Sequence, residues 1–549
     1  MAEAETEQTE PLLPPAEVER RKRSGGRSCP VKMRNGKPCG WPIYQAPPGV
    51  DGQPVCLMHS KDPNKSGVEF QSVFDEILAA AGAGLADFTG FVFPSAPYSG
   101  RAFIASCCFE EATFAQGADF RRATFTHDAD FSRVSFTQRA SFSWATFAQH
   151  VYFSEATFVQ DADFFEAKFT RAAHFAEATF TQRAYFIRAT FAQAANFLRA
   201  TFAQHANFLG VMLTQEAVFL EARFAQDADF GAATFKGPAR FEGPPEELAD
   251  KPCGFKAKLL FRAARFEDYA DFRGVVFGSG DDSTARPVFS LARFEKPERA
   301  TFHNCWLGHA LFVNCDVSRV NFSDVAWGRR GKPVRLYEEE VPLDKEEGQP
   351  LKPRAGDPNE RNYRLIGETY HQLKVNYDSK GDPWTAGEFH YGEMEMKRKW
   401  SRWRNPALRW LGQHFGLTAL YRWTAAYGLS IGRPLAWLAI VLALFTLLYP
   451  WVGLRPSPGK SPLPAAQATA PATPLTYRNF DTGREPVRGL IRLWGHSLVT
   501  AVGVASLQRD VAYFEPNYGW GRLLALLELV CSTTLLALFL LAVRRQFKR

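Results

Sequence analysis

The amino-acid sequence predicts a multidomain chain of β and α parts, in which a β-solenoid precedes a helical pair and a region with two transmembrane helices. Twelve units of eleven residues fill residues 112–243, and a short fixed period is typical of a solenoid. Two apolar stretches follow at 434–454 and 521–543, and each is long enough to cross about 30 Å of hydrocarbon as a helix. A length of 549 residues leaves room for about three or four domains.

Residues 1–27 predict a disordered, charged tail. They begin with acidic residues, continue through PLLPP and end in the basic run RRKRSGGR, without the long apolar stretch of a secretory signal. The basic run suits lipid headgroups or nucleic acid, but we prefer the simpler interpretation of a solvated tail.

Residues 28–62 predict a metal-binding module with four ligands: Cys29, Cys39, Cys56 and His59, spaced C-x9-C-x16-C-x2-H. Three thiolates and one imidazole suit tetrahedral zinc, and the segment has too few apolar residues to fold without a metal. It is similar to short Cys3His modules of bacterial and phage proteins. The alternative is a set of unligated thiols. We expect a structural zinc site, because protein donors fill all four positions.

Residues 66–82 predict a helix that caps the N-terminal end of the solenoid. Phe70, Phe74, Ile77 and Leu78 recur at helical spacing, so one apolar face is available to cover the first aromatic layer.

Each repeat unit places Ala or Val two residues before an aromatic position. Position 9 of every unit is Phe, and position 3 is Phe in every unit except the one with Leu213. On a helix, where each residue turns about 100°, the two members of such a pair would point to opposite sides. On a strand, residues i and i+2 share a side, so both would point inward. We therefore expect Phe side chains to stack from coil to coil, about 4.8 Å apart, inside a β-solenoid.

The repeat resembles the pentapeptide-repeat family. Ala-Asp-Phe begins at Ala118, Ala129, Ala162 and Ala228, Ala-Asn-Phe at Ala195 and Ala206, and VNFSD at Val320. The resemblance implies a right-handed, four-sided β-helix over 86–327, with GSGDDSTARP (278–287) as a loop outside the stack. Every second pentapeptide carries one extra residue, so we expect coils of about 22 residues before the spacing becomes a steady five from Ala300.

The solenoid carries nearly balanced charge: residues 112–243 hold 13 Asp and Glu against 12 Lys and Arg. Some soluble members of the family imitate DNA, which requires a strongly negative face. The balance argues against that role and against a nucleic-acid partner. A cytoplasmic protein partner is the expectation for this surface.

Between the solenoid and the membrane, the sequence predicts three segments. Residues 328–358 are charged and rich in Pro and Gly, which is typical of a solvated linker. Residues 359–400 predict a helical pair, the second helix beginning at Asp382, and resemble a segment common in bacterial pentapeptide-repeat membrane proteins. In 401–432, Trp and Tyr alternate with Arg and Lys, which favours a helix in the membrane interface.

Basic flanks predict the orientation of both spans. KRKWSRWRNPALRW precedes the first span and RRQFKR follows the second, so both flanks should face the cytoplasm. We expect a multi-pass protein of the bacterial inner membrane with cytoplasmic N- and C-termini. Residues 455–485, which are low in complexity, predict a flexible linker outside the cytoplasm.

Residues 489–507 predict a short dipping helix, similar in layout to the pore helix of two-span ion channels. TAVGVAS stands where such channels have a filter, but Thr-Val-Gly-Tyr-Gly is absent, so potassium selectivity is not implied. Glu528 is costly in hydrocarbon and should face a pore, a partner subunit or the interface. The pore candidates are His496, Thr500, Val502, Gly503, Ser506 and Glu528.

Two functions follow from these patterns. The first is a homo-oligomeric two-span channel, with four copies as the simplest assembly and the cytoplasmic solenoid as its sensor. The second is a membrane-anchored adaptor, in which the solenoid and the zinc module bind a partner and the spans only hold the chain in lipid. We do not expect an enzyme, because the sequence has no phosphate-binding loop, nucleophile elbow or paired catalytic carboxylates.

Overall fold

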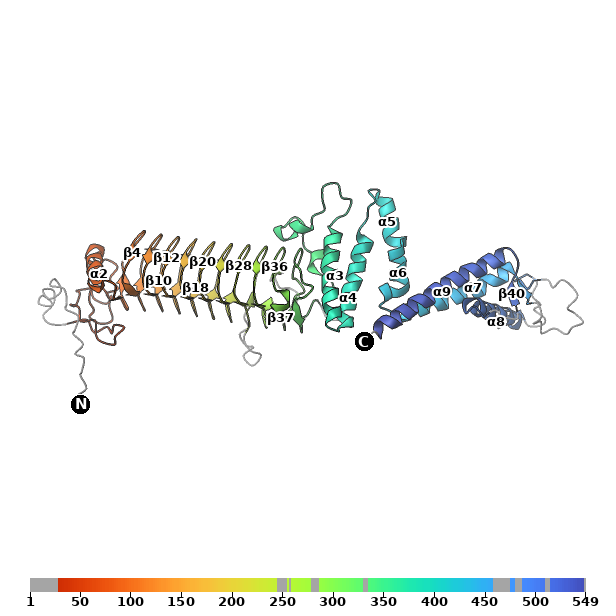
Figure 1. The fold of residues 1–549 in the computed structure, drawn as a ribbon, viewed down its shortest axis with the longest axis horizontal. Coiled ribbons are helices and arrows are strands. Elements are labelled where there is room, and N and C mark those ends of the chain that lie inside the picture. The colour runs from red at the N-terminus through yellow and green to blue at the C-terminus, as the bar shows by residue number, and fades with distance from the viewer. Residues whose placement is uncertain are drawn as a thin grey trace, which may run out of the picture. The chain divides into compact units, whose positions relative to one another are not determined.

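The structure is a computed structural model that describes residues 28–243, 254–255, 258–277, 286–328, 334–457, 474–478, 486–508 and 514–547. The chain divides into two compact units, Met1–Lys352 and Pro353–Arg549 (Figure 1). The tail predicted for 1–27 lies outside the described residues, as do most of the predicted loop 278–287 and most of the predicted linker 455–485.

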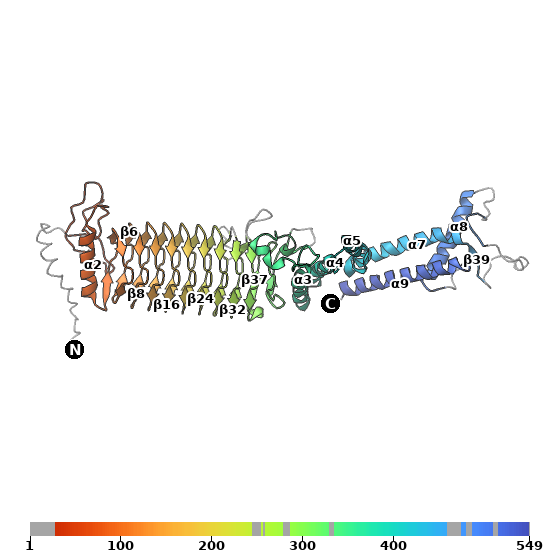
Figure 2. The same ribbon diagram turned by 90° about the horizontal axis from the view of Figure 1, so that it is seen from above.

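The first unit contains a β-solenoid built from four parallel sheets (Figure 2). The sheets run from β1 (Leu85–Asp87) to β38 (Asn321–Ser323), from β2 (Val92–Phe93) to β34 (Val276–Phe277), from β3 (Ala96–Pro97) to β35 (Arg286–Val288), and from β4 (Ala102–Phe103) to β36 (Arg293–Phe294). In the regular part each strand pairs with the strand four places further along the chain, so one coil passes through all four faces. This arrangement confirms the predicted four-sided solenoid.

Strand register shows the length of a coil. Ser135 pairs with Thr157, and Thr157 pairs with Thr179, a step of 22 residues. Near the C-terminal end Thr301 pairs with Asn321, a step of 20 residues, where the sequence returns to plain pentapeptides. Two extra residues in a coil are therefore accommodated at its corners without breaking the stack.

Phenylalanine rings fill the interior from coil to coil. Phe164 stacks on Phe186 and Phe186 on Phe208, with ring centroids 4.8 Å apart and planes within 3° of parallel in both pairs. Phe186 also meets Phe197 edge to face at 5.4 Å. These rings are fully buried. Burial contributes roughly 1.5–3 kcal/mol for each ring, and aromatic pairing adds about 0.5–1.5 kcal/mol.

One column of rings is interrupted by an aliphatic side chain. Leu213 of β24 (Met212–Leu213) pairs with Phe191 on one side and with Phe235 on the other, and it is buried like the rings it replaces. Because Leu has no ring, this layer keeps the burial of its neighbours but loses their stacking.

The corners of the coils hold non-glycine residues in the left-handed backbone region. Glu155, Arg188 and Arg199 have φ angles of 58°, 54° and 53°, which cost an L-residue about 1–2 kcal/mol. Their side chains lie outside the stack: Arg188 is 3.4 Å from Glu166, and Arg199 is 2.9 Å from Glu221. Exposed ion pairs contribute only about 0–1 kcal/mol each, so the aromatic interior must hold the corners in this conformation.

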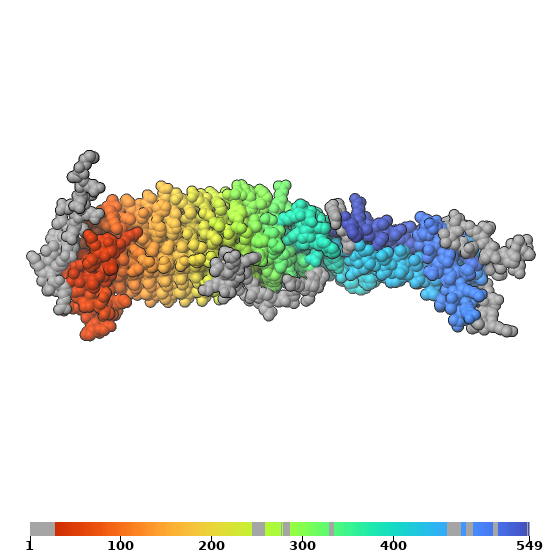
Figure 3. All heavy atoms as spheres, turned by 90° about the horizontal axis from the view of Figure 1, so that it is seen from below, coloured from red at the N-terminus to blue at the C-terminus, as the bar shows by residue number. Residues whose placement is uncertain are grey.

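Helix α2 (Gly67–Ala81) covers the N-terminal end of the stack. The Ser66 side chain accepts a hydrogen bond from the Glu69 backbone and starts the helix. Phe70 and Phe74 are buried, and Phe74 stacks on Tyr98 of the first coil at 5.1 Å. The first aromatic layer is thereby removed from water. Figure 3 shows α2 and its neighbours (red) at the N-terminal end of the stacked coils (orange to green).

The C-terminal end is covered by a segment that the sequence predicts as a linker. Within 334–352, η3 (Tyr337–Glu339) and η4 (Glu346–Leu351) follow each other, and Val341 and Leu351 are buried. The prediction of a solvated linker over 328–358 is therefore wrong for these residues.

Acidic side chains attach this cover to the solenoid, which explains how so charged a segment packs. Glu347 lies 2.6 Å from Lys258, and the buried Glu338 carboxylate accepts a 2.8 Å hydrogen bond from the Phe312 backbone. The last coil has no further strand to pair with, so a side chain satisfies this N–H group instead. Burial raises the pKa of Glu338 to about 7.

The second unit begins with helices α3 (Tyr363–Ser379) and α4 (Pro383–Lys399). Asn362 caps α3, which no sequence pattern marked, and Asp382 caps α4 with Pro383 at the first helical position, where the sequence predicts the start of the second helix. Two shorter helices follow, α5 (Pro406–Phe415) and α6 (Leu417–Ala425).

The interfacial segment is two helices, not the single helix predicted over 401–432. The break lies at Gly416, whose backbone is extended with φ −68° and ψ 168°. Glycine has a low helix propensity, which accounts for the position of the break.

Three longer helices complete the second unit: α7 (Gly432–Val452), α8 (Pro486–Ala505) and α9 (Trp520–Gln546). α7 packs against both α8 and α9, and β39 (Leu454–Pro456) pairs antiparallel with β40 (Phe514–Pro516). α7 and α9 coincide with the two predicted spans to within three residues at each end.

Phe186→Ala should destabilise the solenoid, because it removes a ring that is stacked on both sides and leaves a cavity. We expect a loss of about 3–5 kcal/mol in the free energy of unfolding, measured by hydrogen exchange in the adjoining coils. Gln182→Ala, which shortens an exposed side chain of the same coil, should change little. Equal effects of the two variants would contradict an aromatic source of stability.

The C-terminal cover should lose stability as the pH rises. The pKa of Glu338 is about 7 in the folded chain against an ordinary value of 4.5, so its contribution is complete below pH 4.5 and lost as the pH passes 7. The difference corresponds to about 3 kcal/mol. Hydrogen exchange in 334–352, corrected for intrinsic rates, should therefore quicken between pH 5 and pH 8 in the wild type. Glu338→Gln should abolish this dependence, and its persistence would exclude Glu338 as the cause.

Candidate metal centre and membrane helices

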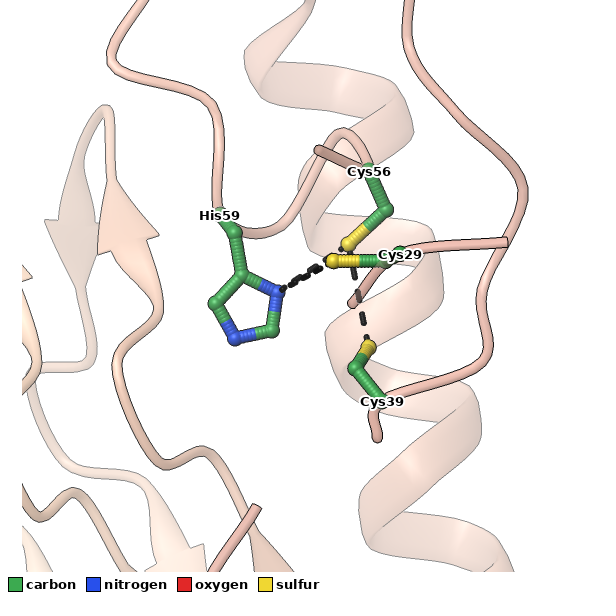
Figure 4. A group of neighbouring side chains, drawn as sticks. All are labelled: Cys29, Cys39, Cys56 and His59. Carbon is green, nitrogen blue, oxygen red and sulfur yellow. Dashed lines mark hydrogen bonds between the residues drawn. The ribbon is translucent and has the colours of Figure 1, made fainter. Parts of the chain in front are cut away.

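Four side chains meet at the N-terminal end of the first unit (Figure 4). The His59 Nδ1 atom lies 3.1 Å from the Cys56 Sγ and 3.6 Å from the Cys29 Sγ, and the Cys39 Sγ lies 3.8 Å from the Cys56 Sγ. All four potential ligand atoms are within 4.8 Å of one another. The structure thus brings together the four predicted residues, and the group could hold a metal ion.

Local backbone hydrogen bonds position these ligands. The Cys29 N–H donates to the Trp41 carbonyl at 2.7 Å, which closes the loop that carries Cys39. The His59 N–H donates to the Cys56 carbonyl at 3.1 Å. This turn is what the C-x2-H spacing requires, since it places both side chains on one side of the backbone.

The ligand group concentrates negative charge. Hydrogen bonds from the Cys39 and Cys56 thiols lower the pKa of Cys29 well below its ordinary value, and the bonds to Cys29 and Cys56 raise the pKa of Cys39. Burial opposes a charged His59 ring, but the sulfur atoms of Cys29 and Cys56 raise the pKa of His59 to about 10. Without a metal, the four groups therefore share protons through these contacts, and a bound cation would favour the thiolate form of the three cysteines and the neutral ring of His59.

His59 connects the ligand group to the solenoid. Its Nε2 atom donates to the Thr89 carbonyl of the first coil at 3.0 Å, which leaves Nδ1 as the ligand atom. The ring also meets Phe91 edge to face at 5.0 Å. The Val92 N–H donates to the Met58 carbonyl at 2.7 Å, so the backbones are joined as well. The ligand group and the first coil form one packed structure.

Lys65, which no sequence pattern marks, holds this junction together. The side chain is buried, and its Nζ donates to the carbonyls of Leu57, Ser60 and Val92 at 2.9, 2.8 and 2.5 Å. Burial lowers the pKa of Lys65 to about 7. The three acceptors belong to backbone segments that only the folded chain brings together.

Arg34 lies at a second group of potential ligands. Cys108, Glu110 and Asp130 are within 4.8 Å of one another, and the Arg34 guanidinium donates to Asp130 at 2.8 Å. The Arg34 backbone N–H also donates to Asp87 at 3.1 Å. Arg34 already supplies a positive charge here, so these contacts dock the metal module on the solenoid.

Helices α7 and α9 carry apolar side chains on the outside and polar ones on the inside, the reverse of the usual distribution in a protein surrounded by water. Both are long and apolar enough to cross a membrane, and only 22% of each apolar window is buried. The exposed side chains include Leu435, Ile440, Leu444 and Leu447 on α7 and Leu523, Leu526, Leu527, Val530, Leu536, Leu540 and Leu541 on α9. The buried polar side chains are Glu528 and Ser532 on α9, together with Ser497 and Thr500 on the neighbouring helix α8. Hydrocarbon would cover the apolar surface that water would leave exposed.

Glu528 lies between the two long helices. Its carboxylate accepts a hydrogen bond from the Tyr449 hydroxyl of α7, and both side chains are fully buried. Within one chain Glu528 therefore faces α7, and its placement toward a pore, a partner subunit or the interface stays a prediction about an assembly of several copies. The Tyr449 hydroxyl bonds only the Oε2 atom, and among the described residues the buried Oε1 atom has no hydrogen-bond partner, so one carboxylate oxygen is left unsatisfied inside the helix pair.

The helix α8 continues through the segment that the sequence places at a channel filter. TAVGVAS is helical as far as Ala505, and α8 coincides with the helix predicted over 489–507 to within three residues at each end. In an α-helix the backbone carbonyl groups accept hydrogen bonds within the helix, whereas the carbonyl groups of a filter must be free to coordinate ions. The helical part of TAVGVAS therefore forms no carbonyl filter, in line with the absence of Thr-Val-Gly-Tyr-Gly from the sequence.

The remaining pore candidates divide between two sides of α8. Thr500 and Gly503 are buried and line a cavity of about 510 Å³ between α8, β40 and α9. His496 is half-buried with its ring 4.6 Å from Phe514, whereas Val502 and Ser506 are exposed. Only Thr500 and Gly503 of the predicted set line this cavity.

Part of the solenoid matches a known family model. Residues 120–168 and 164–212 match the model described as pentapeptide repeats, in 9 copies. No curated protein and no solved structure gives a significant match to the chain. The matched residues lie in the regular coils, where the Ala-x-Phe pattern is strictest.

Cys56→Ser should abolish metal binding, because it removes the thiol nearest to His59. We expect about one zinc ion for each wild-type chain by elemental mass spectrometry and a small fraction of that in the variant. Hydrogen exchange in β1 and β2 should also quicken, since His59 loses its fixed orientation toward Thr89. Cys315→Ser, at a buried thiol of the solenoid, should retain the metal. Equal zinc content in all three proteins would rule out this site.

Proposed function

We propose that this chain is a membrane-anchored adaptor. Its first unit, a solenoid of pentapeptide repeats, binds a partner, and α7 and α9 cross the membrane. The observation that carries the proposal is the reversed polarity of the α7–α9 pair, with leucines outside and Glu528 inside. In water, each exposed Å² of apolar surface costs about 25 cal/mol, and lipid removes that cost.

Zinc is the metal we propose for the Cys3His group. Three sulfur donors and one nitrogen donor form a set that zinc prefers, and they complete its tetrahedral coordination, so the role is structural. Through the contact between His59 and Thr89, the ion would stabilise the first coil and the surface beside it.

The outward faces of the solenoid are the proposed recognition surface. The middle residue of each Ala-x-Phe points outward and changes from coil to coil, from Thr146 to Lys168 to Thr190 along one sheet. Trp144 is exposed at a corner and donates to Glu166 at 3.2 Å. A rigid surface of fixed period, varied chemistry and nearly balanced charge suits a protein partner better than a nucleic acid.

We place both basic flanks in the cytoplasm of a bacterial cell, with the two spans in the inner membrane. Arg402, Arg404 and Arg409 precede α7, and Arg544 and Arg545 lie at the end of α9, which follows the positive-inside rule. α5 and α6 expose Trp, Leu and Phe side chains beside these charges and would lie along the inner leaflet.

A second candidate function is an ion channel made of several copies. The cavity beside α8 favours it, because Thr500, Glu515 and Arg522 contribute to its wall and such groups line water-filled paths in membranes. Two spans cannot enclose a pore, so copies must assemble, with four as the simplest number. Neither role needs a catalytic centre, and we propose that the chain is not an enzyme.

The adaptor should remain in the membrane pellet after alkaline carbonate extraction and should give no ion flux in liposomes above that of empty vesicles. A channel would give flux that falls in Thr500→Ala, at the cavity wall, and persists in Leu541→Ala, on the outer side of α9. Such flux, together with an oligomer seen by light scattering, would contradict the adaptor function and support the channel function. Release of the intact chain into the carbonate supernatant would rule out both.

A further inference from the structure

A second large cavity lies in the second unit, where the chain enters α3 and leaves α4. Its volume is about 770 Å³, and its wall consists of residues 354–359, the first turns of α3 and residues 400–404. Four arginines contribute to this wall: Arg354, Arg364, Arg402 and Arg404. None of the functions considered above uses them as a group.

Hydrogen bonds fix the two sides of this cavity relative to each other. Asn359 is only 6% exposed, and it donates to the Ser401 carbonyl at 3.0 Å and accepts from the Ser401 N–H at 2.9 Å. Arg409 donates to the Pro358 carbonyl. The wall is therefore preformed, which lowers the entropic cost of binding a ligand there.

The four arginines lack acidic partners. Among the residues that the structure describes, no carboxylate oxygen lies within 4.0 Å of any of their guanidinium groups. Asp357 and Glu368 also line the cavity, but Asp357 accepts from the Asn359 side chain at 2.6 Å, and Glu368 is an exposed residue of α3. With Asp357 and Glu368 counted, the wall carries four positive groups against two negative ones, and a bound anion would offset this excess of positive charge.

Trp400 holds two of these guanidinium groups against its ring. Arg402 lies 5.2 Å and Arg364 lies 5.9 Å from the ring centre. A guanidinium group at an aromatic face keeps its N–H donors available, and their fork geometry matches a pair of phosphate oxygens.

We propose that this cavity binds a phosphate group, presented by the headgroup of an anionic membrane lipid. The wall of the cavity continues directly into α5, which exposes Leu408, Leu411 and Phe415. With α5 in the membrane interface, the arginines would stand at the depth of the headgroups. The lipid source rests on the membrane anchoring proposed above, whereas the phosphate site itself does not.

The test uses the full chain in a neutral detergent and measures binding by titration calorimetry. The probes are dihexanoyl phosphatidylglycerol, dihexanoylglycerol without phosphate, and inorganic phosphate. The double variant Arg354→Gln/Arg404→Gln removes two exposed charges from the wall, and Arg492→Gln removes one from the exposed surface of α8 as a matched control. We expect phosphatidylglycerol to bind the double variant about tenfold or more weakly, with the control unchanged.

Each remaining outcome decides the proposal. Phosphatidylglycerol that binds the wild type and the double variant equally, or no more tightly than dihexanoylglycerol, would overturn the site. Inorganic phosphate that binds through the same arginines and that phosphatidylglycerol cannot displace would overturn the lipid source and support a soluble phosphate ligand. Because these titrations need no bilayer, their failure is separate from a failure of the membrane anchoring.

Discussion

Stacking of phenylalanine rings is the interaction on which the first unit depends. Most strands of the solenoid are two residues long, and many corners hold non-glycine residues in a left-handed conformation. Neither feature is stable alone, and rings such as Phe164, Phe186 and Phe208 offset the cost by repeating the same burial in every coil. A stack also ends in two bare aromatic layers, which is why α2 and residues 334–352 pack where they do.

The metal module belongs to the N-terminal cover of the stack. The His59 ring donates a hydrogen bond to the Thr89 carbonyl, and the Lys65 ammonium group bonds carbonyls of the module as well as that of Val92. The Arg34 guanidinium donates to the Asp130 carboxylate. Free energy released when a metal binds would therefore stabilise the first coil as well as the ligand loops. In the second unit, the buried polar groups and the outward leucines of α7 and α9 form one arrangement, which surrounding hydrocarbon would favour over water.

Much of the fold could be predicted because its signals are local. Ala or Val two residues before Phe indicates a strand and its inward face in every coil, and the close spacing of Cys56 and His59 indicates a turn that brings two ligands together. The features that were missed depend on partners far along the chain. Glu338 meets the Phe312 backbone only after the stack has formed, and Glu528 meets Tyr449 only when α7 and α9 pack. Charged composition alone therefore suggested solvent where the structure has burial.

Leu213 marks the place in the regular coils where one column of stacked rings is interrupted. Tension along the axis of a stack is carried in series, so every layer bears the same force and the weakest one yields first. The layer of Leu213 lacks the ring contacts that its neighbours Phe191 and Phe235 make elsewhere. A pull between the two ends of the solenoid would part it at that layer and leave two shorter stacks, each still closed at its outer end. Within the regular coils, the side chain at one position would thus decide where a stretched stack separates.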